Sequence, residues 1–161
     1  MHRVAQFFGH LTAHVTRDDE ARARELLPAG AWSLFSGMPV ADRRHGLDVA
    51  TRLLAAGHSD RDLLAAALLH DAGKGHRMRV WHRVAGVLLD AASPRLLARL
   101  AAPQPASWRH PFHLYLHHAD LSAQAALAAG CSARTAAFIR GDAAPADAQL
   151  AAALHAADEA S

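Results

Sequence analysis

The chain has 161 residues, of which 52% are hydrophobic and 20% charged, and its formal net charge is +2 when histidine is neutral. This length suits one domain with a substantial core, and a composition rich in alanine, leucine and arginine predicts an all-α fold. The 17 basic and 15 acidic residues make no strong field, and no basic run is interleaved with aromatic residues, so a nucleic-acid partner is not expected.

The first part of the chain is predicted to form helices with clear boundaries. The amphipathic residues 4–15 are expected to dock on the surface of the domain. Thr16 suits the N-cap of the next helix, which is short. Residues 31–39 are interpreted as a connection with apolar anchors. A longer helix is predicted over residues 40–56, and Gly57 is placed to end it.

The next predicted helix carries the most apolar run of the chain. Ser59 is the expected N-cap, with Asp62 three residues later in a box-like arrangement. This helix is expected to end near Gly73. A loop at residues 74–79 then leads into a further helix at residues 80–92.

Helix signals continue through the second half. Pro94 suits the first turn of a helix that Ser93 precedes, and residues 101–108 are the clearest loop. Residues 110–129 form a long helical segment that Gly130 ends.

Two more helices are expected near the C-terminus. Ser132 caps a short one that runs to about Arg140. Residues 141–147 form a turn, and Pro145 opens the last helix. The whole chain is therefore predicted to hold seven or eight helices in one domain, without an internal repeat.

The stretch LLHDAGKGH, residues 68–76, places polar groups at the end of an apolar helix. Adjacent residues on a helix point about 100° apart, so His70 and Asp71 cannot both follow the apolar stripe. An imidazole and a carboxylate bind one divalent ion together where a helix end faces a cavity. The alternative is that a neighbour pairs with His70 while Asp71 is solvated. Lys74, the only lysine of the chain, follows three residues later.

Partners for this pair exist elsewhere in the sequence. His45 lies 25 residues before His70. If the two helices are antiparallel about a turn at residues 57–59, both histidines are at similar distances from that turn and lie close together. Asp158 stands in the last helix, where an acidic residue alone is unremarkable.

Residues 43–75, RRHGLDVATRLLAAGHSDRDLLAAALLHDAGKG, resemble the signature region of the HD-domain superfamily of metal-dependent phosphohydrolases. Members carry a His on one helix, a His-Asp doublet on the next and an Asp on a late helix. The corresponding residues in this chain are His45, His70, Asp71 and Asp158.

The resemblance covers about residues 42–160. It implies a single compact multi-helix HD-type bundle, with residues 1–38 as an N-terminal helical extension and residues 39–161 as the metal-site core.

A subgroup of that family has extra histidines, and residues 117–132 resemble its corresponding segment. The resemblance implies His118 as a further ligand for a second metal. Where the subgroup continues with a His-His pair, this chain has Gly141 and Asp142, so Asp142 is the candidate replacement. The Gly-Tyr-Pro motif of cyclic-di-GMP phosphodiesterases and the acidic pair of (p)ppGpp hydrolases are absent, and neither activity is assigned.

The resemblance implies hydrolysis of a phosphomonoester or phosphodiester, with nucleotides the commonest substrates among the relatives. The cofactor is a divalent ion (Mn, Mg, Co, Ni, Zn or Fe, with Mn or Mg favoured). Asp71 and Lys74 are the candidate catalytic residues, the first on the metal and its water, the second on the phosphate. Further phosphate contacts are expected from Arg44, Arg77 and Arg79.

Two other functions stay open. A few relatives use a di-iron centre for oxygen-dependent cleavage, which His118 permits and Gly141 disfavours. The other is a non-catalytic sensory or scaffold domain with a structural metal. Lys74 is then an ordinary surface lysine.

Histidine is unusually frequent, with 13 scattered residues. His110, His113 and His117 share one face if the helical segment is continuous rather than broken, and this face either lines the pocket or packs in half-buried positions. Seven others are expected to be structural or exposed: His2, His10, His14, His58, His76, His82 and His155.

Cys131 is the only cysteine, which excludes a disulfide framework and suits a reducing compartment. No apolar run approaches the ~20 residues that cross a bilayer. We therefore expect a cytoplasmic protein without a membrane partner, whose oligomeric state the sequence leaves open.

Overall fold

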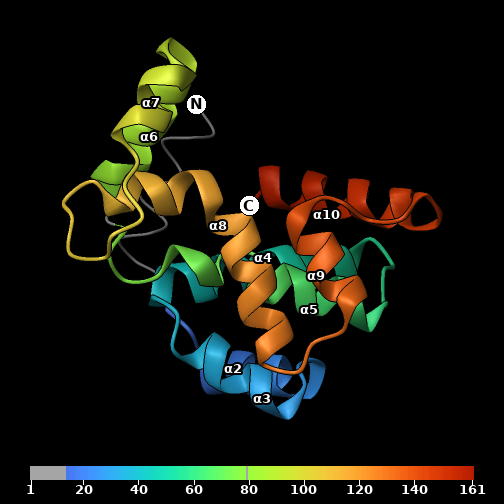
Figure 1. Cartoon of the computed structure of the whole chain (residues 1–161). Coiled ribbons are helices and arrows are strands. Elements are labelled where there is room, and N and C mark those ends of the chain that lie inside the picture. Colours follow the sequence, from blue (N-terminus) through green and yellow to red (C-terminus); the bar gives the residue numbers. More distant parts are fainter. Residues whose placement is uncertain (1–13, 79) are drawn as a thin grey trace.

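The structure, a computed structural model, describes residues 14–78 and 80–161, without the side chains of Val80 and Arg83. Arg79 and most of the N-terminal amphipathic segment therefore lie outside the described residues. Within the described ranges the chain forms nine α-helices, two short 3-10 helices and no strand, so the all-α prediction is confirmed (Figure 1). The elements are α2 (Arg17–Leu26), α3 (Ala29–Ser36), α4 (Val40–Ala55), α5 (Arg61–Leu69), η1 (Ala72–Lys74), α6 (Val80–Ala92), α7 (Pro94–Leu100), α8 (His110–Ala128), α9 (Ala133–Arg140), η2 (Pro145–Asp147) and α10 (Ala148–Glu159).

Helix α5 is the centre of the core. All seven of its residues from Leu63 to Leu69 are buried, with exposed fractions of 0–3%. A helix that is apolar all round is buried on every side, and α2, α3, α4, α9 and α10 all contact α5. Each buried leucine contributes about 1.5–3 kcal/mol through the hydrophobic effect. The C-terminal end of α5 is thereby fixed in the core. This also fixes where the polar residues that directly follow it, His70 and Asp71, lie.

Helix α8 connects the two ends of the molecule. Its first turns contact α6 and α7, which project from the rest of the fold, and its remaining length packs on η1, α3 and α9 (Figure 1). None of the described helices combines the length and the apolar character that a membrane crossing requires.

Several predicted caps are confirmed. Thr16 and Asp19 form a reciprocal capping box at the start of α2. The side chain of Ser132 accepts from the backbone N–H three residues on, at the start of α9, and Ser93, for which no cap was predicted, does the same at the start of α7. These caps are local interactions, which explains why residue type and spacing predict them.

Two predicted boundaries outside α5 are wrong. Residues 31–39 were expected as a connection, but α3 occupies most of them, because Ala31 and Phe35, one turn apart, are both fully buried in the core. The last α-helix begins at Ala148, since Pro145 opens only the short η2. The described residues therefore hold more helices than the seven or eight expected.

The ends of α5 also differ from the prediction. Asp60 caps its start in place of Ser59, accepting from the backbone N–H of Leu63 at 3.0 Å. Asp62, expected to complete a box with Ser59, instead accepts from Ser132 and Thr135 of the α9 start. At the other end α5 stops at Leu69 and the chain tightens into η1.

Candidate metal centre

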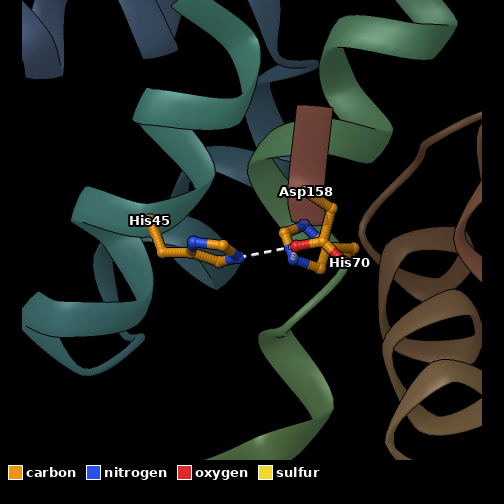
Figure 2. A group of neighbouring side chains, drawn as sticks. All are labelled: His45, His70 and Asp158. Carbon is orange, nitrogen blue, oxygen red and sulfur yellow. Dashed lines mark hydrogen bonds and ion pairs between the residues drawn. The ribbon is translucent and has the colours of Figure 1, made fainter. Parts of the chain in front are cut away.

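The end of α5 meets α4 and α10 at a cluster of two imidazoles and one carboxylate. His45 extends from α4, His70 is the C-cap of α5 and Asp158 lies near the end of α10 (Figure 2). One ligand atom from each lies within 4.8 Å of the other two. His45 Nε2 is 2.7 Å from Asp158 Oδ1, and His70 Nε2 is 3.4 Å from the same oxygen. The structure thus brings together three residues that the sequence analysis singles out.

A close helix contact places the two histidines side by side. A Cβ atom on Gly46 would lie 2.9 Å from the Leu68 carbonyl oxygen, so glycine next to His45 lets α4 approach the backbone of α5. The imidazole rings of His45 and His70 consequently meet edge to face, with centroids 5.1 Å apart.

The ring of His70 is oriented by its own helix. Its Nδ1 lies 2.9 Å from the Ala67 carbonyl oxygen, and because a carbonyl only accepts, Nδ1 carries the proton and donates. Nε2 is then left facing the cluster, buried and without a hydrogen-bond partner. A ring held by a backbone carbonyl, with its other nitrogen free, is the usual arrangement of a metal-ligating histidine.

Asp71 lies beside the cluster and is 2% exposed. Lys74 Nζ donates to Asp71 Oδ2 at 2.6 Å and is equally close to Oδ1. Oδ1 has no hydrogen bond of good geometry, and it faces His70 Nε2 at 3.5 Å. Asp71 is therefore held by Lys74 on one side, and one of its oxygens is directed toward the candidate ligands.

The charges of these groups are coupled. Burial disfavours the charged form of His70, but the carboxylates of Asp71 and Asp158 outweigh it and raise the pKa of His70 to about 8. Burial also opposes ionisation of Asp71, yet His70 and Lys74 hold the pKa of that carboxyl well below its usual range. For Asp158 the same burial effect is overcome by the hydrogen bond from His45 and by the nearby His70 ring, which lower the pKa again. Both carboxylates are thus ionised at neutral pH, and a divalent cation competes there with the proton of His70.

These groups fit a divalent metal ion. His70 Nε2 is buried next to the ligand atoms of His45 and Asp158, and Asp71 Oδ1, which also pairs with Lys74, lies 3.5 Å from His70 Nε2. Two imidazole nitrogens and two carboxylate oxygens suit first-row divalent ions and leave coordination positions for water or substrate.

His118 lies near this centre but outside the three-residue cluster. Its Nδ1 donates to the Tyr115 carbonyl oxygen at 2.9 Å. Burial, and then the positive charge of Lys74, lower the pKa of His118. A neutral imidazole is the form that binds a metal. The structure therefore leaves His118 beside the site without making it part of the cluster.

The other sequence candidates are engaged elsewhere or lie apart. Asp142 is exposed and pairs with Arg140 at 3.1 Å. Arg44 lies between two carboxylates, with 2.7 Å to Asp48 and 2.9 Å to Asp19. Arg77 is exposed, and Arg79 is outside the described residues.

One positioning residue was not found from the sequence. Ser122 of α8 is fully buried, and its hydroxyl accepts from the backbone N–H of Gly73 at 2.8 Å. This bond fixes η1, and with it Lys74, against α8. A serine inside an alanine-rich helix carries no signal that could reveal such a contact, because the partner comes from a distant segment.

The chain matches no protein-family model, no curated protein and no solved structure. The functional argument therefore depends on the geometry of the centre and on the sequence resemblance to HD domains.

Proposed function

We propose that this protein is a metal-dependent phosphohydrolase of the HD type that cleaves a phosphomonoester or phosphodiester, with a nucleotide as the substrate. The observation that carries the proposal is the cluster of His45, His70 and Asp158 next to the Asp71–Lys74 ion pair. The sequence resemblance, which includes these five residues, supports it. A purely structural metal gives no reason for a half-buried lysine beside the ligands.

The ligands of the proposed ion are His45, His70, Asp71 and Asp158. When bound, such an ion polarises a phosphoryl oxygen and lowers the pKa of a coordinated water. The residues themselves supply the remaining requirements. His70 presents Nε2 because Nδ1 is bonded to Ala67.

Asp71 binds the attacking water, and Lys74 stabilises the negative charge of the phosphate. The Asp71 carboxylate stays ionised at neutral pH because its pKa is well below the usual range, so it accepts a hydrogen bond from the attacking water. Lys74 lies in contact with Asp71 and is only 19% exposed. A cation that is partly shielded from water interacts more strongly with other charges, so Lys74 would stabilise the negative charge that phosphoryl oxygens gain in the transition state.

The direct test is hydrolysis by the purified full chain, loaded with Mn²⁺, Mg²⁺ or Co²⁺. Panels of phosphomonoesters, phosphodiesters and nucleotides are assayed for product release. We expect wild type to hydrolyse at least one class and Asp71→Asn to lose at least 100-fold in kcat, as for loss of a group at a reacting centre.

The matched control is Asp90→Asn, which makes the same chemical change at an exposed position of α6. It is expected to hydrolyse at the wild-type rate. Equal rates for wild type and Asp71→Asn would exclude the proposed chemistry, as would a wild type that releases no phosphate and opens no phosphodiester under any of the three metals.

A further inference from the structure

Helix α8 carries a second group of imidazoles outside the candidate metal centre. The rings of His110 and His113 have centroids 5.8 Å apart, and those of His113 and His117 are 4.5 Å apart. His113 and His117 are spaced i, i+4, so they are neighbours one turn apart on the same face. The three rings form a continuous row along the first half of the helix.

This row faces away from the packed side of α8. A Cβ atom on Gly86 of α6 would lie 2.7 Å from the Tyr115 ring, so the Tyr115 side of α8 is the one that rests on α6. At about 100° per residue, His113 and His117 each lie about 160° from Tyr115 around the helix. Their side chains accordingly reach the surface, where His117 is exposed and His113 is half-buried.

The row is also electrically separate from the candidate metal centre. Burial first, and then His117 and His110, lower the pKa of His113. The groups that act on His118 are different: Lys74, Asp71 and His70 of the centre. His117 and His118, about 100° apart around α8, therefore belong to two environments, His118 beside the centre and His117 at the surface.

We propose that His113 and His117 form a second, independent metal site that binds a borderline divalent cation such as Zn²⁺. Imidazole is a ligand that Zn²⁺, Ni²⁺ and Cu²⁺ accept, whereas Mg²⁺ and Ca²⁺ require oxygen ligands. Two histidines at i, i+4 on one helix face also supply two ligands in the helical zinc motif of metalloproteases. The site does not depend on the phosphohydrolase activity and is not part of it.

The ring separation is close to that of shared coordination. With a Zn–N distance of ~2.0–2.1 Å, two imidazoles on one tetrahedral ion have centroids about 5.2 Å apart. The 4.5 Å between His113 and His117 is somewhat shorter, so a small side-chain rotation that parts the rings would let both bind one ion. His110 is adjacent, and its Nδ1 donates to the Ala102 carbonyl oxygen at 3.3 Å. The proposed site therefore rests on His113 and His117, with His110 held to the loop before α8.

The experiment measures Zn²⁺ binding to the full chain by calorimetry and by metal content after dialysis. The background is His45→Ala with Asp158→Ala, which removes two ligands of the centre and leaves the α8 site as the main one. In this background we expect one Zn²⁺ per chain. Adding His113→Ala or His117→Ala should weaken binding at least about tenfold, since even the loss of a supporting residue costs that much.

The control is His155→Ala, which removes an imidazole that is 74% exposed on α10. It should leave Zn²⁺ binding unchanged. Equal weakening by all three substitutions, or none by His113→Ala, would overturn the proposal. Circular dichroism checks that each variant keeps its helix content. We expect no loss, because alanine is a strong helix former. In wild type, Zn²⁺-dependent shifts of the His113 and His117 ring resonances give a second test that uses no variant, and their absence would equally refute the site.

Discussion

His45 Nε2 lies 2.7 Å from Asp158 Oδ1, although 113 residues separate the two in the sequence. Helices α4 and α10 both pack on α5. The packing of these helices therefore brings His45 and Asp158 together. The His45–Asp158 contact also joins α4 and α10 at the candidate metal centre.

We predict that Asp158→Asn lowers the affinity for Mn²⁺ at least about tenfold. The amide keeps the size of the side chain but removes the negative charge that a divalent ion needs, and mutation even of residues that support a ligand costs 10–100-fold. Equilibrium dialysis measures the change. Glu159→Gln, at a neighbouring residue whose side chain is 70% exposed, is the control. Identical Mn²⁺ affinities for the two variants would show that Asp158 is not a ligand.

Metal binding should also stabilise the fold. A ligand that binds only the native state at 100 times its Kd adds about 2.7 kcal/mol, which raises the Tm of a protein of this size by roughly 5–10 °C. Calorimetry with Mn²⁺, and again after addition of a chelator, measures this shift. His45→Ala should remove most of it. A Tm that does not respond to any divalent ion would argue against a metal bound between α4, α5 and α10.

The sequence predicts local features of this fold better than distant ones. Thr16 and Ser132 cap their helices through groups three residues away, so spacing alone reveals them. Ser59 is as good a cap by residue type as Asp60, and the choice between them depends on Arg134, which bonds Asp60 from α9 at 2.7 Å. No pattern within the α5 segment contains that information.

The same distinction applies to the site. His45, His70 and Asp158 could be chosen from sequence because the resemblance supplies the distant pairing. The 2.6 Å contact of Lys74 with Asp71 is not part of the sequence prediction, which assigns Lys74 to the phosphate, although their i, i+3 spacing suits such a pair. The bond between Ser122 and Gly73 depends on a second helix packing against that turn.

The acid sensitivity of the protein should depend in part on Asp62. Burial opposes its ionisation, but hydrogen bonds from Ser132, Thr135 and Arg134 hold the pKa of Asp62 below its usual range. A carboxylate with a depressed folded pKa stabilises the protein above the unfolded value, and this contribution disappears as the pH falls through the folded value. We therefore expect Asp62→Asn to lower the free energy of unfolding by about 1 kcal/mol at pH 7.

At pH 3 the difference between Asp62→Asn and wild type should shrink, because Asp62 is then largely protonated in the unfolded state and stability is already being lost. Urea unfolding at the two pH values measures this. Asp90→Asn, at an exposed position of α6, should have little effect at either pH. If Asp62→Asn lost equal stability at pH 3 and pH 7, its ionised form would not be the source of the stabilisation.

Gly73 tests whether the η1–α8 contact positions the site. A Cβ atom there would lie 2.6 Å from the His118 carbonyl oxygen and 2.7 Å from the Ser122 backbone nitrogen. Both neighbours are backbone atoms of a long helix, so in Gly73→Ala the turn must move. Overpacking of this kind costs about 1–3 kcal/mol in the free energy of unfolding. Since Asp71 and Lys74 flank Gly73, we expect the variant to lose hydrolytic activity in addition to stability.

Gly37→Ala is the comparison, because its Cβ would meet its nearest neighbour at 3.2 Å and its φ of −79° suits alanine. Urea unfolding and the phosphatase assay, run on both variants at a temperature where each is fully folded, separate the two effects. A folded Gly73→Ala with wild-type kcat would show that the activity tolerates displacement of η1. A reduced kcat in Gly73→Ala but not in Gly37→Ala would indicate that close packing of η1 on α8 holds Asp71 and Lys74 in their working positions.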